Sequence, residues 1–301
     1  MLKRIANRKI RNTDSTLLDL VKLFIKEVQD DELTGIAKSM AFSFTLAIFP
    51  GIIFLFTLIP YIPIADLNTY ILSYLQSVLP ETIYQFTADS ITDIISLQRG
   101  SLLSLGFVIA MYSSTSGVLS MMDGFNQCYR TNIKRGFFKT QLLALFINIL
   151  LTFCLISSIL VLVVSKIALN YFMALHFVAV NTYNFIVLMQ LGSVFLFFYL
   201  SISAIYYFGP TVKKTWGFFS VGALFASVLA LLATFLMSIY FENFASYNKV
   251  YGSIGTIMAL MFWLYIVSFV ILLGFELNVS YLKIVSNIKD DSDHLRAKNI
   301  E

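Results

Sequence analysis

The chain has 301 residues, of which 58% are hydrophobic and only 13% are charged, and its formal net charge is +4. A soluble domain carries about 25% charged residues, and it cannot hide this much apolar surface from water. The composition therefore excludes an ordinary soluble protein and predicts an integral membrane protein that lipid covers over much of its surface.

Residues 1–12 form a basic arm, and an amphipathic helix is predicted after it, capped by Thr13, Asp14 or Ser15 and running to about Gln29. Its apolar residues recur at helical spacing: Leu17, Val21, Phe24 and Val28. Such a helix either lies in the membrane interface or packs on other cytoplasmic segments.

Six apolar runs are long enough to cross a bilayer. They cover residues 37–61, 102–122, 142–164, 183–208, 218–240 and 254–273. The last run has no charged residue, and its length at ~1.5 Å per residue matches the hydrocarbon core of about 30 Å. A turn that contains glycine is expected just before it, at residues 251–255.

The predicted fold is an all-α integral membrane protein, a bundle of six transmembrane helices with an N-terminal amphipathic helix. Residues 62–101 carry two amphipathic stretches, which predict a helical extracytoplasmic loop between spans 1 and 2. The expected domains are a cytoplasmic basic arm and helix at 1–36, a transmembrane domain at 37–285 and a polar cytoplasmic tail at 286–301.

The orientation follows from the basic residues, since Lys and Arg concentrate in cytoplasmic loops. Eighteen of the 21 Lys and Arg residues fall in the two termini or in the loops that share their side of the membrane. We therefore expect both termini in the cytoplasm. Because the basic residues follow the topology, nucleic acid is not an expected partner.

Glycine and proline mark positions where helices bend or approach closely. Pro50 and Gly51 lie inside span 1 and predict a kink, and Gly252 is a second candidate hinge before span 6. On span 5 small residues stand four apart and predict close helix packing: Gly222, Ala226, Ala230 and Thr234.

Several polar residues are expected to meet at the cytoplasmic end of the bundle. They are Lys38 on span 1, Asp123, Asn126 and Arg130 at the end of span 2, and Glu276 and Asn278 at the end of span 6. The spacing of the three residues on span 2 predicts one helical face. This cluster is either an ion-pair network that holds helix ends or an inner gate that contacts a headgroup.

A second polar patch lies near the middle of span 2 and consists of Ser113, Ser114, Thr115 and Ser116. Small hydroxyl residues permit close helix packing and bond to carbonyls of their own helix. Alternatively, they line a polar cavity at mid-membrane depth, where transporters bind substrates. Both interpretations are open at the level of sequence.

Catalytic and cofactor motifs are absent from the sequence. His176 and His294 make no zinc spacing with Cys128 and Cys154, and there is no phosphate loop, GxSxG or HExxH motif. The acidic run at 290–293 lies in a polar tail and is a solvated segment rather than a nuclease centre. We therefore expect no enzyme activity, no cofactor and no metal.

Three segments resemble the YihY/BrkB family of bacterial inner-membrane proteins, once labelled ribonuclease BN. They are AKSMAF through IFP at 37–50, the segment ending in DGFNQCYR at 113–130, and the stretch 209–278, which contains GP, YGSIG and GFELN. The likeness covers about residues 30–285. Its matched positions are Pro50, Asn126, Tyr251, Gly252, Glu276 and Asn278.

The resemblance implies a six-helix plasma-membrane protein, and members of the family have been associated with virulence or with envelope lipid transport. We expect a transporter or lipid translocase; the alternative is a structural or scaffold protein of the cell envelope. The nuclease function is disfavoured, because RNA cleavage needs metals or acid-base groups in an aqueous cleft. The expected partners are membrane lipids, an anionic lipid or small-molecule substrate, and a second copy of the chain or an envelope protein.

The predicted topology can be tested with a reporter fused behind Ile300. A reporter that works only in the cytoplasm is expected to be active there, because the flanking basic residues keep the C-terminus inside. A fusion that is active only outside the membrane would contradict the predicted orientation.

Overall fold

The computed structural model describes residues 16–61, 100–130, 135–174, 180–211, 216–243 and 245–286, and the single positions 72, 73 and 92. Its helices are α2 (Leu17–Asp30), α3 (Leu33–Leu58), the short 3-10 helix η1 (Ile59–Tyr61), α6 (Gly100–Cys128), α7 (Phe137–Ala174), α8 (Val180–Phe208), α9 (Val221–Asn243) and α10 (Ala245–Ser286). Six helices, α3 and α6 to α10, are long and apolar enough to cross a membrane. The prediction of an all-α protein with six spans is confirmed.

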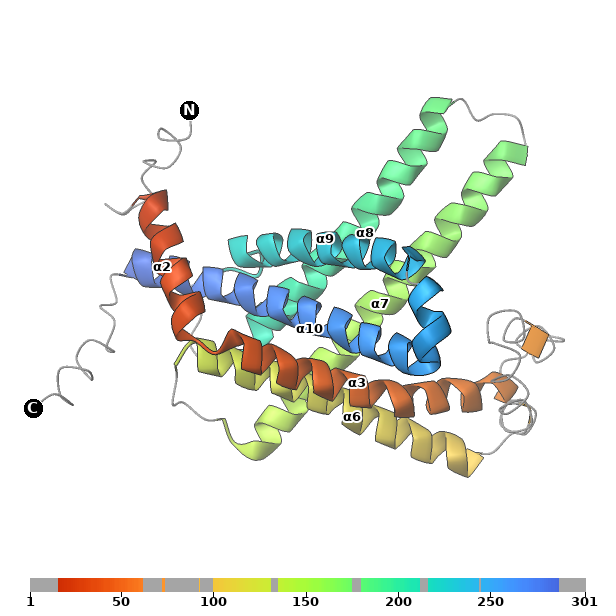
Figure 1. The fold of residues 1–301 in the computed structure, drawn as a ribbon, viewed down its shortest axis with the longest axis horizontal. Coiled ribbons are helices and arrows are strands. Elements are labelled where there is room, and N and C mark those ends of the chain that lie inside the picture. The colour runs from red at the N-terminus through yellow and green to blue at the C-terminus, as the bar shows by residue number, and fades with distance from the viewer. Residues whose placement is uncertain are drawn as a thin grey trace, which may run out of the picture.

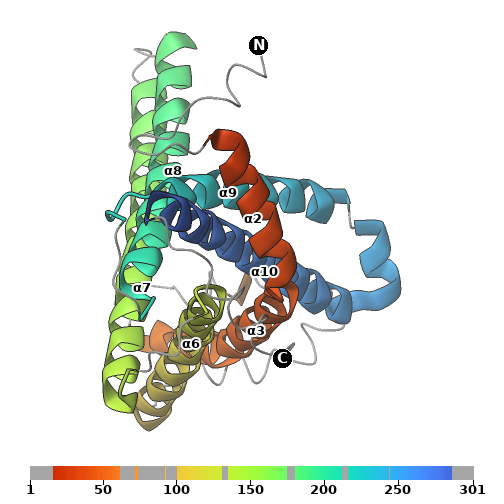
Figure 2. The ribbon, with the colours of Figure 1, turned by 90° about the vertical axis from the view of Figure 1, so that its left-hand side faces the viewer.

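The helices are arranged around α10, which lies against α2, α3, α6 and α9 (Figure 1). α3 and α6 run side by side, and α7 and α8 form an antiparallel pair that projects past the other helices (Figures 1 and 2). α3 begins at the same end of the molecule at which α6 and α10 end. This end, where α2 crosses α10, holds the candidate site.

α2 begins with a capping box in which Thr16 accepts from the backbone N–H of Asp19, and Asp19 accepts from Thr16 in return. The N-cap is thus Thr16, not one of the three residues before it. The inner face of α2 packs on the bundle, and the rings of Phe24 and Phe225 meet edge to face at 6.3 Å. Val21 is exposed, so the inner stripe runs through Leu20, Phe24 and Glu27 rather than through Val21.

Five of the six spans are longer than the sequence predicts, and α9 has the predicted length but is shifted by three residues. α3 begins at Leu33 and continues through Pro50 without a break. α10 takes in residues 251–255, so the prediction of a turn there is wrong. A helix satisfies its own backbone groups, which a turn at membrane depth does not, and glycines are therefore tolerated within it. Gly252 lies in the N-terminal part of α10, which runs at a steep angle to the rest of that helix (Figures 1 and 2).

α9 and α10 approach each other through small residues, as their spacing on span 5 predicts. A Cβ added at Gly274 would lie 2.5 Å from Cβ of Ala226 and 2.6 Å from the hydroxyl oxygen of Tyr206. Ala226 and Ala230 are both fully buried. Backbone-to-backbone contact of this kind requires glycine, because any side chain would separate the two helices.

An aromatic cluster packs beside this contact. The rings of Phe125 and Phe275 stack at 4.3 Å, and Tyr206 meets both rings edge to face at 5.6 Å. The hydroxyl of Tyr206 donates a hydrogen bond to the carbonyl of Ile271. The buried hydroxyl therefore has its partner, as a polar group in an apolar core requires.

Some predictions fall on residues that the structure does not describe. These are the basic arm, almost all of the loop at 62–101, His176, and the tail with its acidic run at 290–293. They lie outside the described residues.

Replacing Gly274 by Ala is expected to destabilise the protein by about 1–3 kcal/mol, because the added methyl group overpacks the contact between α9 and α10. The matched control is Gly192→Ala, since a Cβ at Gly192 on α8 meets nothing within 4 Å. Thermal unfolding in detergent measures both. Equal melting temperatures for the two variants would contradict the close approach.

Candidate functional site

Charged side chains from four separate segments meet at one end of the bundle. Glu27 of α2 is only 1% exposed, and its Oε1 lies 2.7 Å from Nζ of Lys283 on α10. Its other oxygen lies 3.5 Å from Nη2 of Arg130. Because a buried carboxylate is costly without a cation, these contacts hold α2 against α10 and against the end of α6.

Arg130 reaches the cluster from just beyond α6. α6 ends at Cys128, and Arg130 adopts a left-handed conformation with a φ of 51°. Its Nε and Nη2 both donate to Oδ1 of Asp31, each at 3.2 Å. The prediction that Arg130 shares a helical face with Asp123 and Asn126 is therefore wrong, because the helix stops before Arg130.

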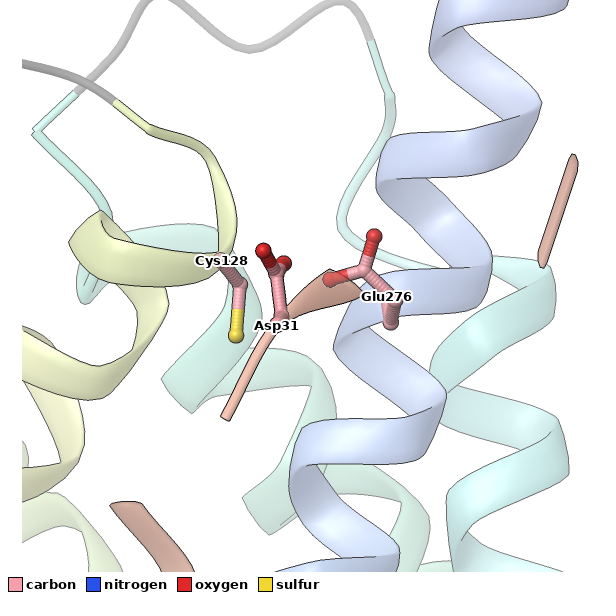
Figure 3. Close-up of side chains that lie close together, drawn as sticks. All are labelled: Asp31, Cys128 and Glu276. Carbon is pink, nitrogen blue, oxygen red and sulfur yellow. The ribbon is translucent and has the colours of Figure 1, made fainter. Parts of the chain in front are cut away.

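Glu276 is fully buried in the same region, and neither of its oxygens has a hydrogen-bond partner among the residues that the structure describes. The side chains of Asp31, Cys128 and Glu276 lie close together, with an oxygen of Glu276 directed toward Asp31 (Figure 3). One donor atom of each lies within 4.8 Å of the others. Oδ2 of Asp31 is also buried without a hydrogen bond. The three residues form what we call the acidic-thiol triad.

Asp31, in the link between α2 and α3, lies outside the spans, and its surroundings make ionisation of its carboxyl group less favourable than in water. Burial raises the pKa of its carboxyl group above the ordinary value, while the Arg130 guanidinium opposes that shift. The desolvation of Asp31 thus outweighs its ion pair. An added positive charge at Oδ2 would stabilise the carboxylate.

The other residues of the predicted cluster have different surroundings. Oδ1 of Asn126 accepts from the backbone N–H and the hydroxyl of Thr211. Asn278 caps α9: its Oδ1 accepts from the N–H of Gly222, and its Nδ2 donates to Ser220, both at 2.8 Å. Both amides join helices to neighbouring segments.

Lys38 and Asp123 do not join the charged network. Both are exposed, and Asp123 lines a separate polar cavity of about 280 Å³ together with Glu32 and Gln127. The expected single cluster is therefore three environments: the buried charged network, the two structural amides and this polar cavity.

A larger cavity of about 680 Å³ lies on the flank of α3, α6 and α7 at mid-length. Its wall is mostly apolar and includes Gly51, Phe44 and Phe107. Phe153 and Leu55 stand at its rim, exposed by 70% and 59%. Since these helices cross the membrane, the cavity faces lipid. Leu264 is the contribution of α10, so the cavity is bounded mainly by the first three spans.

One polar pair lies in the wall of this cavity. The hydroxyl of Ser114 donates to Oδ1 of Asn148 on α7 at 2.7 Å. Thr115 is buried, whereas Ser113 is half-buried and Ser116 is exposed. Of the four residues of the predicted midplane patch, only Ser114 lines the cavity. The following residue, Gly117, packs against the ring of Phe44, so this stretch serves both packing and the cavity.

Sequence reasoning missed five residues of these sites: Glu27, Asp31, Cys128, Asn148 and Lys283. Two of them carried a local signal. Glu27 is a carboxylate at helical spacing from Leu20 and Phe24 on an apolar face, and Asn148 is an amide inside an apolar span. The other three gain their surroundings only from segments far away in the chain.

Replacing Lys283 by Met is expected to destabilise the protein by about 3 kcal/mol, because Glu27 would keep its burial and lose its nearest cation. Adding Glu27→Gln to that variant should restore part of the stability. The control is Lys26→Met on the exposed side of α2, expected to change stability by less than about 0.5 kcal/mol. Thermal unfolding distinguishes these outcomes, and equal effects of the two lysine changes would contradict the buried ion pair.

The comparisons with known proteins agree with this membrane architecture. The chain is 29% identical over 248 residues to the ribonuclease-like protein YfkH of Bacillus subtilis (strain 168), which covers 81% of this chain and 89% of that protein. It is 26% identical over 285 residues to a UPF0761 membrane protein of Delftia acidovorans, covering 91% of this chain and 63% of that protein. A UPF0761 membrane protein of Mannheimia succiniciproducens is 24% identical over 277 residues, with 86% and 88% covered. No solved structure matches the chain.

The profile of the family described as Virulence factor BrkB matches residues 24–298. That range contains all six spans, the charged network and the cavity. This chain therefore belongs to the Virulence factor BrkB family and is a multi-pass membrane protein.

Proposed function

We propose that this protein is a transporter that moves a lipid or another amphipathic molecule through the cavity between α3, α6 and α7. The observation that carries the proposal is the cavity itself. Its volume of about 680 Å³ falls in the ~300–1,000 Å³ range of small-molecule sites, and it opens on the membrane-facing side of the bundle.

The chemistry of the wall supports an amphipathic substrate. Apolar side chains alone give a lipid tail no advantage over the bilayer, since tails and side chains are equally apolar. By contrast, transfer of the polar headgroup of a lipid into hydrocarbon without a hydrogen-bond partner has a large free-energy cost. Ser114 and Asn148 offer hydrogen-bonding groups at that depth, and they would lower the barrier for a headgroup.

In this proposal the protein resides in the bacterial plasma membrane with both termini in the cytoplasm, as the distribution of Lys and Arg indicates. Its substrate would be an anionic lipid or a small amphipathic anion, and an exposed cation such as Lys38 would contact the anionic group. The protein would act without a cofactor, without chemistry on the substrate and without nucleic acid.

The alternative function is a scaffold that organises other proteins of the envelope, either as a homo-oligomer or with a different partner. A scaffold has no need for a lipid-facing cavity with a polar wall, so the cavity favours transport. A stoichiometric partner that co-purifies with an inactive protein would favour the scaffold instead.

The test follows labelled phospholipid between the two leaflets of vesicles that contain the purified protein. Wild type is expected to exceed protein-free vesicles, and Gly51→Leu is expected to slow transfer several-fold, because a Cβ at Gly51 meets only open space and the side chain would fill the cavity. Gly192→Leu is the matched control on α8, where the surroundings are equally open but lie outside the cavity.

Both glycine variants should unfold at temperatures close to that of wild type, so that a lost activity reports on the cavity. Transfer by wild type at the rate of protein-free vesicles would overturn the proposal. If Gly51→Leu and Gly192→Leu slowed lipid transfer equally, transport would not depend on this cavity.

A further inference from the structure

The acidic-thiol triad of Asp31, Cys128 and Glu276 lies beside a third buried carboxylate, that of Glu27. Within the described residues, three buried or nearly buried carboxylates, Glu27, Asp31 and Glu276, share two cations, Arg130 and Lys283, and Arg130 also lies 4.0 Å from the exposed Asp30. An uncompensated charge in a site closed to water costs several kcal/mol. If all three carboxylates are ionised, the charge on Glu276 therefore needs a further partner.

The two cations are already engaged elsewhere. Lys283 lies against Glu27, and Arg130 lies against Oδ1 of Asp31 and against Glu27. Within the described residues, no hydrogen-bond donor reaches either oxygen of Glu276, which is fully buried. Oδ2 of Asp31 is left in the same condition, and the carboxylate of Asp31 lies beside that of Glu276 (Figure 3). The carboxylates of Asp31 and Glu276 therefore lie next to one thiol, and three of their four oxygens lack a hydrogen bond within the described residues.

We infer that Asp31, Cys128 and Glu276 bind one Zn²⁺ ion. The donor set of one thiolate and two carboxylates suits zinc, which accepts both sulfur and oxygen ligands, whereas magnesium and calcium require oxygen alone. Tetrahedral ligands at ~2.0–2.3 Å from zinc lie roughly 3.5 Å from one another, and the three donor atoms, within 4.8 Å of each other, need to close by only about 1 Å.

The charge of the ion fits the site. On binding, the thiol of Cys128 releases its proton to solvent and becomes a thiolate. The site then holds four negative charges, from Glu27, Asp31, Glu276 and Cys128, against the two cations. A divalent ion makes the sum zero, with Arg130 and Lys283 remaining at their observed partners.

The ion would join three segments that are far apart in the chain. Asp31 lies in the link between α2 and α3, Cys128 ends α6, and Glu276 lies on α10. Local spacing of Cys and His could not reveal such a site, because each ligand comes from a different segment. The inference is independent of lipid transport, since the triad shares no residue with the wall of the cavity.

Cobalt is the probe for the test, because a thiolate bound to Co²⁺ gives a charge-transfer band in the near ultraviolet. The full chain, purified in detergent with a tag free of histidine and treated with chelator, is titrated with Co²⁺. We expect one equivalent to bind with this band, and Zn²⁺ to displace it. Cys128→Ser should abolish the band.

The matched control is Cys154→Ser, which removes the other buried free cysteine, on α7 and outside the triad. It should keep the band. Wild-type protein without a band, or a band that disappears with Cys154→Ser and persists with Cys128→Ser, would overturn the inference. A proton on Glu276 would then balance the charge.

Glu276→Gln supplies the second measurement. It keeps the shape of the side chain, and it should weaken Zn²⁺ binding in a chelator competition by at least about tenfold, the loss seen even for outer partners of a ligand. Asp123→Asn, which removes an exposed carboxylate from the same helix as Cys128, should leave the affinity unchanged. Equal affinities for wild type and Glu276→Gln would contradict the assignment of Glu276 as a ligand.

Discussion

The neutralisation of buried charge at one end of the bundle is the constraint on which the rest of the structure depends. A carboxylate that is buried away from water needs a cation beside it. Here Glu27 forms an ion pair with Lys283, and Asp31 forms one with Arg130. These partners come from four segments, so charge pairing holds α2, its link to α3, the end of α6 and the end of α10 together. The packing of α2 on the transmembrane helices follows from it.

α10 connects this charged network to the tightest helix contact in the protein. Gly274 and Asn278 stand one helical turn apart and face α9. Asn278 caps the first turn of α9, and Gly274, which has no side chain, allows the backbone of α9 to pack directly against α10. Glu276 and Lys283 stand two turns apart on another face, toward α2 and the end of α6. One helix thus presents a small-residue face to α9 and a charged face to α2, and the rigid first contact positions the second.

α6 supplies both candidate sites. Ser114 lies in the wall of the membrane-facing cavity, and Cys128 ends the same helix at the acidic-thiol triad. The two residues are about 21 Å apart along the helix at ~1.5 Å per residue. The polar pair at mid-depth and the charged end are therefore separate in space and rest on one rigid element, and a displacement of α6 would alter both.

The sequence by itself determined the membrane class, the six spans and the small-residue face by which α9 packs closely on another helix, because hydrophobic length and the period of small residues are local properties. It also singled out Glu276, since a carboxylate beside a long apolar run needs a partner. Only the tertiary structure decided which partner: Lys38 and Asp123 remain exposed, while Asp31 and Cys128 meet Glu276. The same holds for Asn148 beside Ser114. Contacts between segments distant in the chain depend on how the helices cross and where they end. The residue pattern within a single helix predicts neither of these.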